Sequence, residues 1–192
     1  MLAGLDNINW SQLHHAFGSA SEVPNWIRAL LSEDRQMREK AIYELYENLL
    51  HQGSVYEASF YALPFLLELL KFSTSPDKAD FAVLLADMGN NSGSDRYELS
   101  ETEERTANKN LEERNKYAEA IRLSVRKELN TLYPYLFHEV YYVRAVIAHA
   151  LQAFPEKSQE TIPLLEKALE TESDETTKHT IEDSIRVLST SN

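Results

Sequence analysis

Apolar residues recur every three or four positions along most of the chain, which is the spacing of one face of an α-helix. Residues 35–50 give the clearest example, with apolar positions at Met37, Ala41, Ile42, Leu45, Tyr46 and Leu49. This spacing predicts a helix of about four turns, with Gly53 as the residue that ends it. No segment shows the sustained alternation that is typical of a strand, so we expect no sheet.

Start and stop signals predict further helices along the chain. Ser54 is a candidate cap for a helix from Val55 to Lys71, and Ser75-Pro76 precedes another apolar stretch that runs to Gly89. We also expect an extra N-terminal helix near Trp10. Residues 89–106 are rich in turn-forming and acidic residues and predict an irregular insertion, either functional or without fixed structure. A long helix should resume at about Leu111.

Four prolines share one local context, in which an apolar residue precedes the proline and further apolar residues follow it. They are Pro24, Pro64, Pro134 and Pro163. Three of these segments continue through a polar turn that contains Asp or Glu into a second apolar stretch. The recurrence predicts a repeating helical hairpin, with the proline in the first helix of each copy. We therefore expect residues 1–192 to form one all-α domain of about four stacked hairpins.

The segment from Val140 to Pro155 resembles a HEAT repeat, because Val143-Arg144, Ala148 and Leu151 match the family pattern in the second helix. The first copy keeps Asp34, Arg38, Ala41 and Leu45 of the same pattern, with Met37 in place of the valine. The resemblance covers about residues 21–188 and implies an α-α superhelix, or solenoid, of the HEAT/armadillo type. Asp in the turn and Arg in the second helix belong to that pattern.

Residues 10–70 carry a narrower resemblance, through the strings Leu13-His14-His15-Ala16-Phe17-Gly18 and Asn48-Leu49-Leu50-His51-Gln52-Gly53. They look like a group of bacterial HEAT-repeat proteins that have no assigned activity. Some small repeat proteins of this kind accompany bacterial toxins as immunity proteins. The resemblance thus implies a protein-binding role, at the level of fold analogy.

Composition and charge narrow the function classes. The chain has no cysteine, which excludes disulfides, zinc–thiolate sites and thiol nucleophiles. Its formal charge is −12, from 31 acidic and 19 basic residues, so a nucleic-acid partner is not expected and a basic protein is the easier partner. The sequence shows no signal peptide and no apolar stretch long enough to span a membrane, which favours a cytoplasmic protein. It gives no indication of an oligomeric state.

Catalytic and cofactor motifs are missing from the sequence. The six histidines lack the spacing of metal ligands, and neither a phosphate-binding loop nor a nucleophile elbow occurs. We therefore expect no metal, no cofactor and no enzymatic activity. The alternative is an enzyme, or a lyase-like accessory protein, that uses the concave groove of a superhelix as a small-molecule pocket.

Some aromatic and apolar side chains fall outside the stripe that the core would use. With Leu45 and Ile147 as the centres of the buried faces, the candidate protein-binding residues are Tyr43, Tyr46, Leu50, Tyr142 and His149. Either they line a binding groove or they pack against neighbouring helices. The hypothesis that follows is a non-catalytic scaffold, in its sharper form an acidic inhibitor or immunity-type protein for a basic partner. A structural adaptor is the third possibility.

Overall fold

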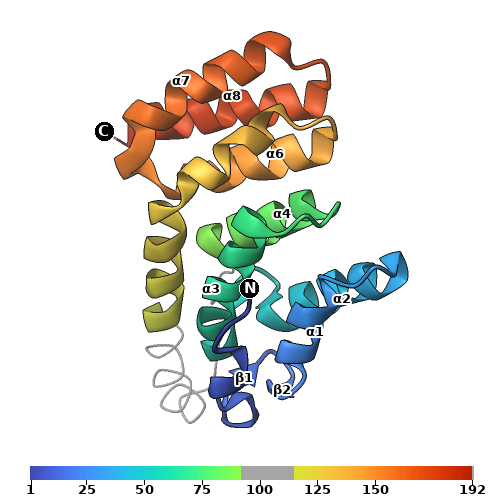
Figure 1. The fold of residues 1–192 in the computed structure, drawn as a ribbon. Coiled ribbons are helices and arrows are strands. Elements are labelled where there is room, and N and C mark those ends of the chain that lie inside the picture. The colour runs from blue at the N-terminus through green and yellow to red at the C-terminus, as the bar shows by residue number, and fades with distance from the viewer. Residues whose placement is uncertain (92–114, 192) are drawn as a thin grey trace.

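The chain folds mostly into α-helices, as a computed structural model that describes residues 1–91 and 115–191 shows (Figure 1). The α-helices are α1 Val23–Ala29, α2 Arg35–Leu49, α3 Glu57–Phe72, α4 Lys78–Asn90, residues 115–127, α6 Tyr141–Ala150, α7 Ser158–Thr171 and α8 Glu175–Thr190. Short 3-10 turns are η1 Leu5–Asn7, η2 Trp10–Gln12, η3 Leu129–Thr131, η4 Tyr133–Phe137, η5 Leu151–Ala153 and η6 Pro155–Lys157. The helical class predicted from the spacing of apolar residues is confirmed.

Consecutive helices pack in pairs, and the second helix of each pair packs on the next. The pairs are α1 with α2, α3 with α4, η4 with α6, and α7 with α8. Contacts between α2 and α4, α4 and α6, and α6 and α8 place the four second helices one above another (Figure 1). Each of them contributes a fully buried residue to one core, namely Leu45, Leu84, Ile147 and Ile181. Burying such a side chain stabilises the fold by about 1.5–3 kcal/mol.

The predicted polar turns act as helix caps at two places. Asp34 precedes α2 and its carboxylate accepts a hydrogen bond from the backbone N–H of Gln36 at 2.8 Å. Asp174 precedes α8 and accepts from the N–H of Thr177 at 2.8 Å. Each carboxylate satisfies a donor that has no partner within the helix and faces the positive end of the helix dipole.

The four prolines share a sequence context but not one structural role. Pro24 lies in the first turn of α1, where a proline costs no hydrogen bond. Pro64 and Pro163 lie inside α3 and α7. Pro134 begins the 3-10 turn η4, so the third pair has a 3-10 element where the others have an α-helix. The expectation of a proline-bearing first helix therefore holds for three pairs.

Two short hairpins correct the prediction of a fold without sheet. β1 His14–His15 pairs with β2 Gly18–Ser19, and β3 Leu50–His51 pairs with β4 Ser54–Val55, both antiparallel. Strands of two residues are too short to produce an alternating pattern, so the sequence did not indicate them.

The second hairpin, β3 with β4, also corrects three predictions: the roles of Gly53 and Ser54 and the first residue of α3. Gln52 and Gly53 have positive φ angles of 51° and 76°, as a two-residue hairpin turn of type I′ requires, so Gly53 is not a helix cap. Ser54 lies in β4, and α3 begins at Glu57 instead of Val55. The Ser59 side chain accepts from the N–H of Tyr56 at 2.8 Å and supplies the cap that we had assigned to Ser54.

The N-terminal region differs from the predicted helix near Trp10. It contains the 3-10 turns η1 and η2, followed by β1 and β2. Trp10 is buried, and its indole N–H donates to the carbonyl of Leu5 at 2.8 Å. An apolar body with a satisfied polar end explains how a single tryptophan holds this irregular segment on the core.

The helix at residues 115–127 runs parallel to α3 and is held at both ends. Tyr117 donates to Glu57 at the start of α3 (2.8 Å), and Glu128, just after the helix, pairs with Lys71 near the end of α3 (2.6 Å). The Asn91 side-chain amide donates to the carbonyl of Ala118 at 3.1 Å. The residues that flank the predicted insertion therefore lie side by side.

The boundaries of that insertion change at its N-terminal side, because Gly89 and Asn90 belong to α4. Residues 92–106 and the predicted helix start at Leu111 lie outside the described residues. Among the described helices, none combines the length and the apolar character needed to cross a bilayer.

Candidate functional site

Polar and aromatic side chains gather on the outer face of the second helices α2, α4 and α6. We name this surface the tyrosine–aspartate strip and define it by Tyr43, Tyr46, Asp80, Asp87, Tyr142 and His149. Asp80 and Asp87 are seven residues apart on α4, as Tyr142 and His149 are on α6, and this spacing returns to the same side of a helix after two turns. Because α4 lies between α2 and α6, the two carboxylates have tyrosines on both sides.

The central contact of the strip joins α2 to α4. The Tyr46 hydroxyl donates to Oδ2 of Asp87 at 2.5 Å, and both side chains are half-buried. Burial, followed by the charge of Asp87, raises the pKa of Tyr46 well above its ordinary range. The phenol therefore stays protonated at neutral pH and acts as a hydrogen-bond donor, not as a base.

The two carboxylates of the strip are harder to ionise than ordinary aspartates. Burial raises the pKa of Asp87, against the opposing effects of the Tyr46 hydrogen bond and the charge of His149. Burial also raises the pKa of Asp80, and the nearby charges of Asp77 and Glu39 add to the increase. Within the described part of the chain, neither carboxylate forms an ion pair with Lys or Arg.

Tyr142 connects the strip to α6. Its side chain is 56% exposed, yet partial burial and the charges of Asp87 and Asp80 raise its pKa. The neighbouring Tyr141 is 55% exposed. Tyr142 therefore lies close enough to α4 for the charges of Asp80 and Asp87 to act on its hydroxyl.

The structure brings together four of the five predicted binding residues. Tyr43 is 62% exposed on the same side of α2 as Tyr46, and Tyr142 and His149 lie beyond α4 on α6. Leu50 does not reach this surface. The expectation that it points away from the core is wrong, because α2 ends at Leu49 and the chain turns into β3, which leaves Leu50 only 7% exposed.

Asp80 and Asp87 are strip residues that the sequence reasoning missed. Both flank an uninterrupted apolar run, Phe81 to Ala86, in which every residue is buried. Acidic residues at the same helical position on either side of such a run were the available signal, because a helix covered on nearly all sides has one narrow face left for them.

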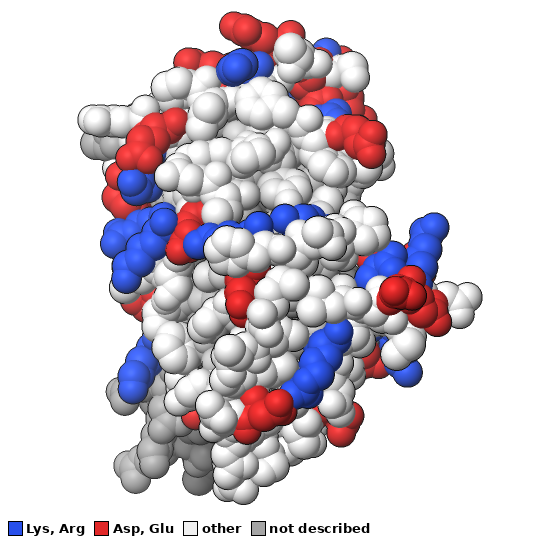
Figure 2. All heavy atoms as spheres, viewed as in Figure 1, with Lys and Arg blue, Asp and Glu red and all other residues white. Residues whose placement is uncertain are grey.

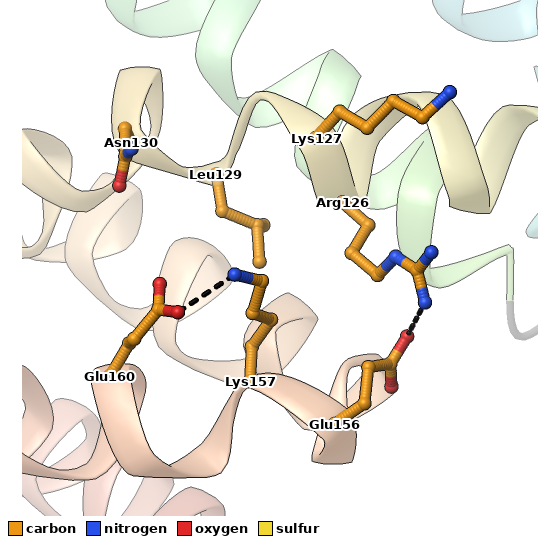
Figure 3. A pocket seen from close by; sticks show the side chains of 7 residues that line it. All are labelled: Arg126, Lys127, Leu129, Asn130, Glu156, Lys157 and Glu160. Atoms are coloured by element: carbon orange, nitrogen blue, oxygen red, sulfur yellow. Dashed lines mark hydrogen bonds and ion pairs between the residues drawn. The ribbon is translucent and has the colours of Figure 1, made fainter.

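Two surface hollows lie apart from the strip. The larger, of about 490 Å³, is lined by Arg126, Lys127, Leu129, Asn130, Glu156, Lys157 and Glu160 (Figure 3). Its cationic groups point to acidic neighbours: Arg126 binds Glu156 at 2.9 Å and Lys157 binds Glu160 at 2.7 Å, while Lys127 extends away (Figure 3). These pairs neutralise the hollow and leave little attraction for an anion.

The smaller hollow, of about 440 Å³, lies between the turn that joins α1 to α2 and the turn that joins α3 to α4. Arg38, Ser32 and Pro76 are among the residues that line it. No predicted binding residue lines either hollow.

Metal ligands do not gather in the described residues, where no group of three His, Asp or Glu side chains is arranged to hold an ion. His138 and His149 lie near Asp80 and Asp87, respectively, but only as single imidazoles beside single carboxylates. The arrangement suits the binding of a cationic group from outside more than the coordination of a metal.

Charges of both signs are interspersed on the face drawn in Figure 2, with uncharged areas between them. Comparisons of the chain with protein families, with curated proteins and with solved structures give no match.

Proposed function

We propose that this chain is a HEAT-like helical repeat protein without catalytic activity, and that its tyrosine–aspartate strip binds a basic segment of a partner protein. The order of the helix pairs supports the repeat assignment, because α2, α4, α6 and α8 are the second members of their pairs and contact one another in sequence. An α-α superhelix of hairpins has this connectivity.

Two equivalent arginines add support for the repeat assignment. Arg38 in α2 and Arg144 in α6 each lie three positions after the first residue of the helix. Both reach back to two backbone carbonyls in the preceding turn and forward to a carboxylate from a following turn. Equivalent contacts to the preceding turn at matching helix positions are expected of copies of one repeat unit.

The observation that carries the binding proposal is half-buried Asp87, with exposed Asp80 on the same side of α4; among the described residues, neither carboxylate is paired with Lys or Arg. A carboxylate that is withdrawn from water is costly unless it is paired, and the described residues give the Asp87 side chain one hydrogen bond, from the Tyr46 hydroxyl, and the nearby charge of His149. A lysine or arginine from a partner would form ion pairs with both carboxylates. Tyr142 and Tyr43 would add ring faces for the same cation, an interaction of about 0.5–2 kcal/mol each.

A basic protein segment fits this strip better than nucleic acid does. The chain carries a net charge of −12, so long-range electrostatics attract cations and repel phosphates. An acidic inhibitor or immunity-type protein that blocks a basic partner is one form of this function, and an adaptor is another. Both require the same strip.

The proposal is tested with an array of short peptides that vary the number and spacing of Lys and Arg, followed by titration of the tightest binder. We expect Asp87→Asn and Tyr142→Ala each to weaken binding by roughly thirtyfold, which corresponds to an anchor worth about 2 kcal/mol. The association rate should fall as salt rises, because screening acts over roughly 8 Å at physiological ionic strength.

Tyr141→Ala is the matched control, because Tyr141 directly precedes Tyr142 in α6 and its side chain is exposed to nearly the same extent. Glu170→Gln, on the exposed side of α7, controls for loss of one negative charge. Equal losses for Tyr141→Ala and Tyr142→Ala, or tight binding of acidic peptides, would refute the assignment of the strip.

A further inference from the structure

The two equivalent arginines, Arg38 and Arg144, differ in the hydrogen bonds of one guanidinium nitrogen, Nη2. In both, Nη1 donates to two backbone carbonyls: those of Ser32 and Glu33 for Arg38, each at 3.0 Å, and those of His138 and Glu139 for Arg144, at 2.7 and 3.0 Å. These contacts fix each guanidinium at the turn before its helix.

The contacts with the carboxylate partner differ between the copies. Arg144 donates from both Nε and Nη2 to Glu172, with two distances of 2.6 Å. Arg38 donates to Asp77 from Nε alone, so within the described residues its Nη2 makes no hydrogen bond. Aspartate is one methylene shorter than glutamate, and here a single oxygen of its carboxylate engages the guanidinium.

The arginine that carries the unpaired nitrogen lines the smaller hollow. Arg38 is only 7% exposed and lines that hollow together with Leu31, Ser32, Thr74, Ser75 and Pro76. Among the described residues, the side-chain polar atom that is both fully enclosed and unpaired is Ser73 Oγ, so Nη2 of Arg38 is not enclosed. Nη2 therefore keeps contact with solvent, and because Arg38 lines the hollow, we take its N–H groups as the donors available there, held in a fixed orientation by three other contacts.

The surroundings of this donor select a neutral acceptor. The charge of Arg38 is already balanced by Asp77, and Glu33 lines the same hollow. A second carboxylate would meet net negative charge, whereas an amide carbonyl would accept the hydrogen bond without that repulsion. The side chains of Leu31, which is 39% exposed, and Pro76 offer apolar contact for an aliphatic group next to the carbonyl.

We infer that the hollow beside Arg38 is a binding site for a neutral aliphatic amide, such as a main-chain carbonyl followed by a leucine-like side chain. The carbonyl oxygen accepts from Nη2 of Arg38, and the aliphatic group packs on Leu31 and Pro76. None of the residues of the tyrosine–aspartate strip lines this hollow, so the inference does not depend on the proposed function.

The test is a titration of the ¹⁵N-labelled full chain with two probes, N-acetyl-leucine methylamide and N-acetyl-leucine. The first is neutral, and the second ends in a carboxylate. We expect the neutral probe to shift the backbone amide signals of Leu31, Ser32 and Ser75, with saturation, and the anionic probe to bind about tenfold more weakly or not at all. Absence of saturable shifts at these residues, or tighter binding of the anion, would overturn the inference.

Asp77→Glu should remove the free donor of the site, because the new carboxylate would pair with Nη2 of Arg38. The longer carboxylate can reach Nη2 as Glu172 does for Arg144, and Asp77 makes no side-chain capping bond whose loss would disturb α4. We expect binding of the neutral probe to fall about tenfold at unchanged folding. Leu31→Ala removes an exposed apolar side chain from the lining of the hollow and leaves Arg38 in place. It should weaken binding of the same probe by a smaller factor.

Lys167→Met, on the exposed side of α7, is the control that should bind the probe as the parent chain does. If Asp77→Glu folds and binds as the parent chain does, the free nitrogen is not the recognition element and the inference is wrong. If Asp77→Glu does not fold, unchanged binding by Leu31→Ala overturns the inference equally.

Discussion

Gly89 in α4 lies against the side chain of Val125, in the helix at residues 115–127, so closely that position 89 has no room for a side chain of its own. A Cβ at Gly89 would stand 2.7 Å from Cγ1 of Val125 and 3.1 Å from the ring of Phe154. The first distance is shorter than real Cβ contacts, and the second is shorter than most of them. The glycine thus sets the spacing between the second pair of helices and the helix that follows residues 92–114.

Gly89→Ala should destabilise the protein. Overpacking of a well-filled interior costs about 1–3 kcal/mol, whereas the gain in helix propensity is at most about 1 kcal/mol. The measurement is the free energy of unfolding by urea, followed by circular dichroism. A variant as stable as the parent chain would mean that α4 and its neighbour separate without cost. Adding Val125→Ala to Gly89→Ala should recover part of the loss, because it removes the atom in closest contact.

Arg144→Met should be among the most damaging single changes outside the apolar core. It leaves the carboxylate of Glu172, whose side chain is 1% exposed, without its cation, and breaking such a pair costs about 3–5 kcal/mol. Arg186→Met is the matched control, because Arg186 is 72% exposed and its pair with Asp183 should contribute less than about 1 kcal/mol. Similar unfolding free energies for the two variants would contradict this ranking.

Glu172 should also make stability depend on pH in the acid range. The hydrogen bonds from Arg144 lower the pKa of Glu172 from 4.5 to about 2, despite the opposing effect of burial. The unfolded chain therefore takes up the proton first as pH falls. The stabilisation, on the order of 3 kcal/mol, is complete above pH 4.5 and is lost as pH falls toward 2. Urea unfolding at a series of pH values should show this slope, and Glu172→Gln should flatten it.

Tyr46→Phe removes the hydroxyl that donates to Asp87. That hydrogen bond lowers the pKa of Asp87, so we expect the pKa to rise further in the variant, and stability to fall by about 0.5–1.5 kcal/mol. Carbon-13 NMR of the aspartate carboxyl groups measures the titration directly. Tyr43→Phe, at a 62% exposed position on the same helix, should leave the Asp87 titration unchanged.

The apolar spacing predicted the parts of the fold that repeat with the period of a helix. The stripe centred on Leu45 is buried as expected at Ala41 and Leu49, with 2% and 0% exposure, but not at Met37, which is 53% exposed in the first turn of α2. Local backbone geometry was not predictable in the same way. Gly53 fits both a helix cap and a hairpin turn, and the choice depends on the pairing of Leu50 with Val55.

The candidate site was predictable only in part, for a related reason. Tyr43, Tyr46 and Tyr142 stand out because a one-sided helix has no need of them. The partner of Tyr46 lies on another helix, and nothing in the spacing along α2 indicates that its hydroxyl meets Asp87. Likewise, the free nitrogen of Arg38 follows from the way Asp77 and Glu172 meet the two arginines, which is seen only when the two copies are compared in three dimensions.

The hydrogen bond from the side chain of Asn91 to the carbonyl of Ala118 joins the two borders of residues 92–114. Since the chain leaves and re-enters the described fold at one point, the flanking helices impose no distance that the intervening residues must span. Closing a longer or shorter connection there changes the free energy slowly with its length. This position is therefore the natural place in the chain for variation in length, and for a reporter domain inserted without disturbing α4 or the helix at residues 115–127.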